Sequence, residues 1–221
     1  MHTNNTIYIA NKPSFGSIKQ EKIIAEKLLK KCRNTIKDAR SNTFIKTKIY
    51  QHENDKKYQK IIEELIVLSE IYRQQVVESR QFIKVNSPYK TFDDMVQKIK
   101  TAIQKFRAGN CGEINYIFQS EFLKHNINAH AVMFTTYSQE TLKKIPSKDH
   151  TFLVFNLKPD AKLNAPATWG SRAIIADAWS NIVMKADDAL NYYKQIFKFN
   201  EKEEIRILAS ADKINLKDGI R

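Results

Sequence analysis

The chain has 221 residues and a mass of 25.7 kDa, which suits one well-packed domain with a small helical extension and excludes two full domains. Hydrophobic residues make up 42% of the sequence, near the globular norm, whereas only five glycines and five prolines occur. So few turn-forming residues argue against a turn-rich all-β fold and predict an α+β fold with helix in excess.

The formal net charge of +13 is concentrated in the first half of the chain. Residues 1–110 hold 22 Lys or Arg against 11 Asp or Glu, while residues 111–221 hold 15 against 13. A basic surface suits an acidic protein, anionic lipid or nucleic acid. Glutamates alternate with the lysines at helical spacing, which is equally typical of a solvated helix face. Nucleic acid ranks last, because the aromatic residues of this half fall on apolar helix stripes and leave no stacking platform.

Cys32 and Cys111 are the two cysteines, so no disulfide framework is required and a reducing compartment is expected. The first six residues lack the basic-then-apolar order of a Sec-type signal peptide, and no apolar run approaches the roughly 18 residues of a transmembrane helix. We therefore expect no transmembrane segment. The bias toward Lys, Asn and Ile favours a bacterial protein, located in the cytoplasm and exported into a host cell by specialised secretion.

The first half of the chain is predicted to be a basic helical region, residues 18–106, after a loosely ordered lead-in at residues 1–17. Three apolar stripes with a 3.6-residue period predict helices over residues 18–40, 57–82 and 92–106. Cys32 falls on the first stripe and is expected in the core. Thr91 offers an acceptor for the first-turn amides of the third helix.

Residues 107–221 are predicted to form an α+β region that continues the same domain, so that residues 18–221 make one unit. A helix is expected from Cys111 to about His125. Short runs of β-branched and aromatic residues predict the strands of one sheet, followed by a helix and a last strand. These elements are expected at residues 128–135, 151–157, 172–177, 187–197 and 204–208.

Cys111 lies between two of the five glycines, where a loop leads into a helix. The free amides and the positive dipole end of a helix start stabilise a thiolate. Gly109 and Gly112 would let a substrate carbonyl approach the backbone, and the amide of Cys111 could donate to an oxyanion. This pattern indicates a nucleophile. The alternative is a packing residue at a helix start.

Five histidines could supply the base. His125 is 14 residues further along the same helix, roughly 21 Å away, and cannot reach the thiol. His2 and His52 lie in polar segments. His150 begins a predicted strand beside a loop, where a side chain can be both oriented and open to substrate. His130 lies within a strand, as packed or surface histidines commonly do, so His150 is preferred.

Asp177 ends the predicted strand that follows the His150 strand. If the two strands are antiparallel neighbours, the start of one meets the end of the other, and Asp177 lies beside His150. A carboxylate there holds the imidazole tautomer and stabilises its charged form. Taken alone, Asp177 could equally be a turn residue. Together with Cys111, however, the order and the positions in the elements predict a catalytic triad.

Metal and cofactor chemistry have weaker support in the sequence. No close ligand pair anchors a zinc site on Cys111, His130, His150 and Asp177. The glycines are scattered and form no phosphate-binding loop. We therefore expect no metal and no cofactor.

The three motifs around these residues, Asn-Cys-Gly-Glu, Asp-His-Thr-Phe-Leu-Val-Phe and Ile-Ile-Ala-Asp-Ala-Trp, resemble the papain-like superfamily, including its transglutaminase-like and bacterial-effector branches. The resemblance covers residues 107–180, and Ala178 replaces the proline of the Asp-Pro-Trp motif common in those effectors. It implies a papain-like fold with a catalytic helix packed on a small antiparallel sheet, and it leaves the helical N-terminal half unaccounted for. It also implies Cys111 as nucleophile, His150 as general base and acid, and Asp177 as the orienting residue.

The same resemblance points to residues that contact the substrate or its oxyanion. Papain-type enzymes use a glutamine shortly before the cysteine, and Gln104 is the nearest candidate, one place off the papain spacing. It could also be an exposed residue of the preceding helix. Asn110, Gly112 and Trp179 are the other candidates; a tryptophan after a strand is otherwise a common core residue.

These residues predict a cysteine-dependent acyl-transfer enzyme that acts on a protein substrate through a thioester, and a host protein is one candidate for that substrate. The triad serves a thiol protease, a glutamine deamidase and a transglutaminase alike, and the effector resemblance favours the last two. The alternative is a non-catalytic basic helical module, residues 18–106, that binds an acidic protein or an anionic membrane.

Overall fold

The computed structural model describes residues 18–37, 39, 41, 45, 48–49, 52, 54–85 and 89–209. Within these residues the α+β fold is confirmed, with α-helices packed against an antiparallel sheet. The predicted lead-in, residues 1–17, lies outside the described residues.

The α-helices that precede the sheet lie close to their predicted positions. They are α1 (Ile18–Thr35), α3 (Gln59–Val85), which follows a 3-10 turn (Lys56–Tyr58), α4 (Phe92–Phe106) and α5 (Cys111–Lys124). The α4 start is capped as expected, because the Thr91 hydroxyl accepts from the Asp94 amide at 3.1 Å. Helix α1 ends five residues before its predicted end at residue 40.

The second half supplies the sheet and one more helix. The strands are β1 (His130–Ser138), β2 (Lys144–Phe155), β3 (Ile174–Asp177), β4 (Ile182–Lys185) and β5 (Glu203–Ala209), and α6 (Ala186–Ile196) follows β4. They form an antiparallel sheet in the order β4-β3-β2-β1-β5. Sequence analysis missed β4, and it placed the start of β2 several residues too late.

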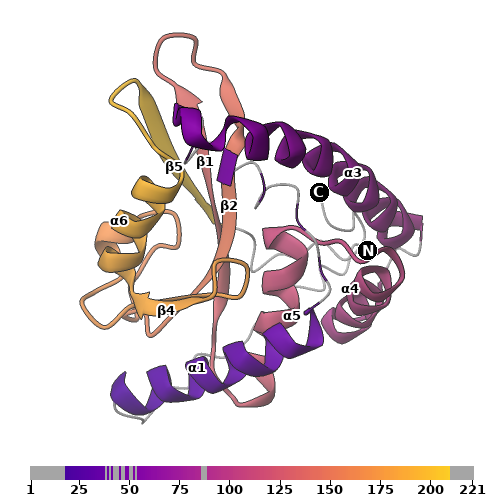
Figure 1. Cartoon of the computed structure of the whole chain (residues 1–221). Helices are drawn as coiled ribbons and strands as arrows, with labels where there is room; N and C mark the ends of the chain where they lie inside the picture. The colour runs from indigo at the N-terminus through magenta and orange to yellow at the C-terminus, as the bar shows by residue number, and fades with distance from the viewer. Residues whose placement is uncertain are drawn as a thin grey trace, which may run out of the picture.

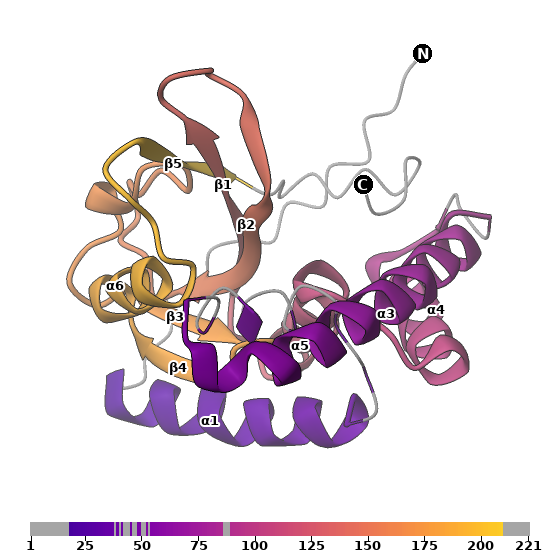
Figure 2. The same ribbon diagram turned by 45° about the horizontal axis from the view of Figure 1, so that its top comes forward.

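The sheet has helices on both faces (Figures 1 and 2). Helices α1 and α5 cover one face, where Phe155 of β2 packs on Phe122 of α5 with ring centroids 5.2 Å apart. Helix α6 covers the other face, where Phe134 of β1 packs on Tyr193 at 5.7 Å. One buried hydrophobic cluster extends from α1 to α6 and includes Cys32, as predicted. Side chains of α5 and of α6 therefore pack on opposite faces of the sheet.

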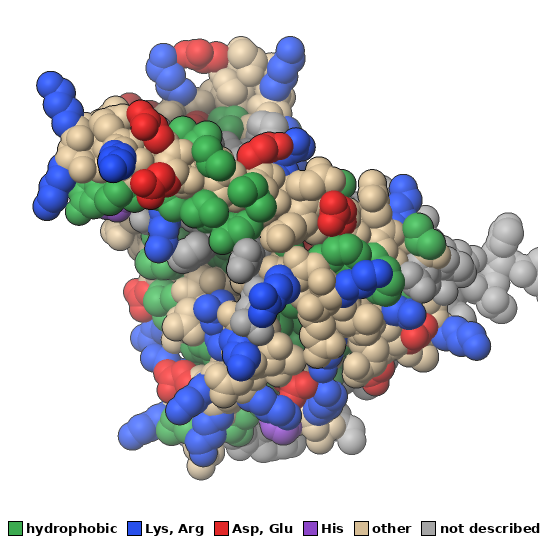
Figure 3. Space-filling view, turned by 45° about the vertical axis from the view of Figure 1, so that its right-hand side comes forward, with side chains coloured by type: hydrophobic (Ala, Val, Ile, Leu, Met, Phe, Trp, Pro, Cys, Tyr) green, Lys and Arg blue, Asp and Glu red, His purple; other side chains and the backbone are tan. Residues whose placement is uncertain are grey.

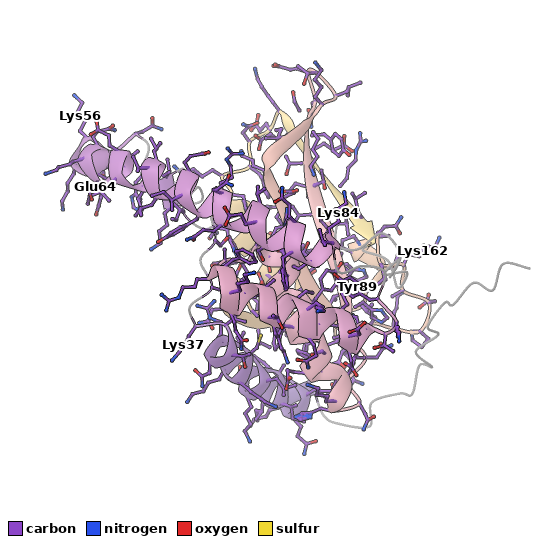
Figure 4. The ribbon with its side chains drawn as sticks, turned by 90° about the vertical axis from the view of Figure 1, so that its right-hand side faces the viewer. Lys37, Lys56, Glu64, Lys84, Tyr89 and Lys162 are labelled. Atoms are coloured by element: carbon purple, nitrogen blue, oxygen red, sulfur yellow. The ribbon has the colours of Figure 1, made fainter. Side chains whose placement is uncertain are left out.

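Helix α3 is longer than the α4 helix it packs against. Val76 and Ile83 are buried, whereas Ile61, Ile66 and Val67, nearer its start, are exposed. Figure 4 shows the N-terminal part of α3, where Glu64 is labelled, projecting from the rest of the molecule together with the 3-10 turn that holds Lys56. Figure 3 shows hydrophobic side chains along this part of α3. No helix of the described residues has the length and apolar character that crossing a membrane requires.

Candidate active site

Cys111 is the first residue of α5, as predicted, and its side chain is partly exposed. Asn110 is the N-cap residue. Its backbone amide donates to the Glu113 carboxylate at 3.0 Å, which fixes the first turn of the helix. The Ser41 hydroxyl donates to Asn110 Oδ1 at 2.8 Å and accepts from Trp179 Nε1 at 3.0 Å. The thiol therefore sits at the positive end of a capped helix.

Glu113 is a negatively charged residue of the protein interior, two residues after Cys111. It is fully buried, and Arg80 of α3 pairs with it, Nε lying 2.6 Å from Oε1. Burial alone would raise the pKa of Glu113, but the Arg80 guanidinium and the hydrogen bonds of the cap outweigh it and lower that pKa. Arg80 also lies within electrostatic range of Cys111. The ion pair thus joins α3 to the start of α5.

Replacing Arg80 by methionine is expected to destabilise the protein by about 3 kcal/mol, because it leaves a buried carboxylate unpaired. The loss lies at the lower end of the range for such pairs, since the Arg80 side chain is 41% exposed and water reaches it. Urea unfolding measures the change. Adding Glu113→Gln should recover most of the loss; equal losses in the single and double variants would contradict this account.

The two glycines beside Cys111 have different roles. A Cβ on Gly109 would lie 3.1 Å from Ile103 Cδ1, so this glycine serves packing against α4, and the predicted role in substrate approach does not fit it. A Cβ on Gly112 would meet no atom within 4 Å. The backbone next to the thiol is therefore open at Gly112, whose place in a substrate site stays a prediction.

Alanine at the two positions is expected to act in opposite directions. Gly109→Ala should destabilise by about 1–2 kcal/mol through overpacking against Ile103. Gly112→Ala should stabilise by about 0.5–1 kcal/mol, because it lies in a helix with room for a methyl group. Thermal unfolding of both variants gives the comparison. A destabilised Gly112→Ala would mean that this side of the helix is not open.

His150 lies within β2, opposite Phe134 of β1, where the pairing of β2 with β3 has ended. The prediction that His150 begins the strand is wrong, since β2 starts at Lys144. The predicted neighbour is nevertheless present: His150 Nε2 lies 2.6 Å from Asp177 Oδ2, at the end of β3. The antiparallel pairing of the two strands brings the residues together, as expected.

Asp177 is fully buried and surrounded by donors. Besides His150, Oδ2 accepts from the Tyr193 hydroxyl at 2.8 Å, and Oδ1 accepts from Asn115 Nδ2 and from the Trp179 amide, each at 2.9 Å. Burial would raise the pKa of Asp177, but His150 and these hydrogen bonds outweigh it and lower the pKa to about 2. The carboxylate is thus charged and can only accept hydrogen bonds.

The charge of Asp177 sets the protonation of His150. Because the carboxylate only accepts, Nε2 carries a proton and donates it to Oδ2. Burial would lower the pKa of His150, but the Asp177 carboxylate outweighs burial and raises it. An imidazolium is therefore favoured over a wide pH range.

The second ring nitrogen of His150 is the one left for the nucleophile. Nδ1 is buried and makes no hydrogen bond to any described residue. Cys111 lies near enough to act on the ring electrostatically and adds to the rise in the pKa of His150. Catalytic hydrogen bonds are often long before substrate binds. The arrangement can therefore hold a thiolate beside an imidazolium whose far side is fixed by Asp177.

Trp179 covers the histidine, with ring centroids 4.7 Å apart. Gln104 is exposed on α4. Its side chain makes no hydrogen bond to a described residue, so its oxyanion role stays a prediction. His125 is the C-cap residue at the far end of α5, as expected. His130 begins β1, four residues before Phe134 and so roughly 13 Å along the strand from the level of His150.

Sequence analysis missed Asn115 and Tyr193, which both bind Asp177. Asn115 gave a usable signal: it is a polar residue one helical turn after Cys111, within an otherwise apolar stretch. Tyr193 gave none, because a tyrosine on an amphipathic helix is common. Among the described residues no three His, Cys, Asp or Glu side chains form a group that could hold a metal ion.

Comparison with known proteins found no matching family model, no matching curated protein and no matching solved structure.

Proposed function

We propose that this protein is a cysteine-dependent acyl-transfer enzyme of the papain-like type, with Cys111 as nucleophile, His150 as general base and acid, and Asp177 as the orienting residue. The observation that carries the proposal is the buried His150–Asp177 pair, joined at 2.6 Å, with its other ring nitrogen left for a thiol at a helix start. A buried imidazole held in one tautomer beside a partly exposed cysteine is the arrangement that nucleophilic catalysis requires.

The reaction proceeds in two acyl-transfer steps. The Cys111 sulfur attacks the carbonyl carbon of an amide, and the amide of Cys111 stabilises the oxyanion. His150 gives its proton to the leaving nitrogen as the C–N bond breaks, which leaves a thioester. Water or an amine, deprotonated by His150, then attacks the thioester and releases the thiolate. Each step leaves His150 ready for the next.

We place the amide of a glutamine side chain, in a protein substrate, first among the possible acyl donors. His150 is 1% exposed and Trp179 covers it, so a substrate reaches the site from the side of the thiol. A slender side-chain amide fits this approach better than a polypeptide backbone that must lie across the site. Deamidation and transglutamination follow when water or a lysine amine resolves the thioester.

Intact-mass spectrometry of glutamine-containing proteins, with Cys111→Ala as the control, tests the reaction. Deamidation gives a mass gain of about 1 Da, and transglutamination gives a joined product. Backbone cleavage would replace the glutamine proposal by a protease. If no protein changes and an acyl-chloromethylketone probe labels Cys111 no faster than it labels Cys32, the enzyme proposal is wrong. Translocation of a reporter fusion from bacteria into host cells tests the accompanying proposal of specialised export.

A second function has support from α1. Ile23 and Ile24 are exposed, and the nearby Lys19, Lys27 and Lys30 make no ion pair with a described residue. Figure 3 shows many Lys and Arg side chains over the lower part of the molecular face in that view, where α1 lies. Apolar groups among cations fit an acidic protein surface. Binding that weakens with salt and survives Cys111→Ala would support this role, whereas binding to anionic vesicles alone would replace the protein partner by a membrane.

A further inference from the structure

Asn115 is fully buried on α5, one helical turn after Cys111. Its amide makes three hydrogen bonds to the sheet. Nδ2 donates to the Thr151 carbonyl at 2.7 Å and to Asp177 Oδ1 at 2.9 Å, and Oδ1 accepts from the Ala178 amide at 2.9 Å. Both amide hydrogens and the oxygen are therefore used.

We propose that Asn115 is a positioning residue that fixes the nucleophile helix in register with the His150–Asp177 pair. The three triad residues come from three elements, α5, β2 and β3. Asn115 lies on α5 and binds residues of both β2 and β3. Thr151 directly follows His150, and Ala178 directly follows Asp177. A slide or rotation of α5 that moved Cys111 away from His150 would break these bonds. The catalytic consequence rests on the proposed function; the geometric one does not.

Asn115 also determines which oxygen of Asp177 serves the histidine. Asn115 Nδ2 and the Trp179 amide both bind Oδ1, so Oδ2 is left for His150 and for the Tyr193 hydroxyl. A side chain here must donate twice on one edge and accept on the other, which an amide does and a carboxylate or an aliphatic group does not. Replacement of Asn115 therefore removes one of the two hydrogen bonds that hold Oδ1 and leaves that of the Trp179 amide.

Gln119 provides a matched control on the same helix. It lies one further turn along α5, is also buried, and its Nε2 donates to the Ala129 carbonyl at 2.8 Å. It ties α5 to the chain just before β1, away from the triad. Gln119→Ala thus removes a buried amide-to-backbone bond of the same kind, with no bond to Asp177 or to the residue after His150.

The experiment compares Asn115→Ala with Gln119→Ala by two measurements. The first is the pH profile of Cys111 alkylation by iodoacetamide; at pH 6.5 we expect a loss of roughly tenfold in Asn115→Ala and less than about twofold in Gln119→Ala. The second is the downfield proton resonance of His150 Nε2–H, bound to Asp177, which should broaden or shift in Asn115→Ala alone. If Asn115→Ala does not fold, Asn115→Ser, which leaves room for a bridging water, takes its place.

The outcomes separate this inference from the proposed function. If both variants lose similar thermal stability and Asn115→Ala keeps the wild-type profile and resonance, Asn115 is structural and the inference is overturned. If wild-type Cys111 shows no activation that depends on His150, the proposed function fails. The imidazole resonance then still decides whether Asn115 positions the pair.

Discussion

Alanine at His150 is expected to slow the alkylation of Cys111 by iodoacetamide roughly 100-fold at pH 6.5. Asp177 raises the pKa of His150, so the ring is charged at this pH, and a charged ring favours the thiolate form that iodoacetamide attacks. Removing the ring leaves the helix dipole as the main stabilising field. The difference in Cys111 alkylation rate between the wild type and His150→Ala should shrink as the pH rises past about 8.5, where a free thiol ionises without help.

Two internal comparisons make this measurement specific. Cys32 is buried, and burial raises its pKa to about 12, so it reports the behaviour of an inactive thiol in the same sample. His125→Ala removes a histidine at the opposite end of α5 and should leave the profile of Cys111 unchanged. Peptide mass spectrometry reads both cysteines. Equal rates for Cys111 in the wild type and in His150→Ala would remove the main support for a nucleophile.

The Cys–His–Asp arrangement could be predicted from the sequence because Cys111 and Asp177 lie at the ends of regular elements, whereas His150 lies within β2. Cys111 marks a helix start between glycines, and Asp177 marks a strand end, so the antiparallel pairing of two neighbouring strands was enough to bring Asp177 to His150.

The parts that sequence analysis missed depend on tertiary contacts. Strand β4 has four residues and follows a short turn, so its pattern is too brief to separate from a loop. The early part of β2 contains polar residues and pairs with β1 across a bulge near Thr135. Gly109 was assigned to substrate approach because its contact with Ile103 depends on how α4 meets α5. The burial of the Glu113 charge could not be predicted, because it depends on the ion pair with Arg80, which lies on another helix.

Asparagine at Asp177 is expected to lower any acyl-transfer activity roughly 1,000-fold or more, because it reverses the hydrogen bond to the histidine. With Oδ1 still held by Asn115 and the Trp179 amide, the new NH2 group faces His150 Nε2 and can only donate. Nε2 must then accept, so the proton of the neutral ring moves to Nδ1, the nitrogen that faces the thiol. The histidine can no longer take the proton of Cys111.

The same substitution should change stability in a pH-dependent way. The pKa of Asp177 is lowered on folding, so its contribution is present above the unfolded value of about 4 and is lost as the pH falls through about 2. The pKa of His150 is raised, so its contribution is present below the unfolded value of about 6.5 and declines as the pH rises above it. The cost of Asp177→Asn should therefore be greatest between about pH 4 and 6.5, at roughly 3 kcal/mol.

Urea unfolding at a series of pH values measures this window, with Asp149→Asn as the control. Asp149 precedes His150 and pairs with Lys144 at 3.0 Å, but this pair is partly exposed, so its loss should cost less than about 1 kcal/mol. A flat difference between the wild type and Asp177→Asn from pH 4 to 9 would mean that the histidine and the aspartate are not a charged pair. The thiolate would then lack its counter-ion, since Nδ1 of a neutral ring gives Cys111 a proton acceptor but no positive charge.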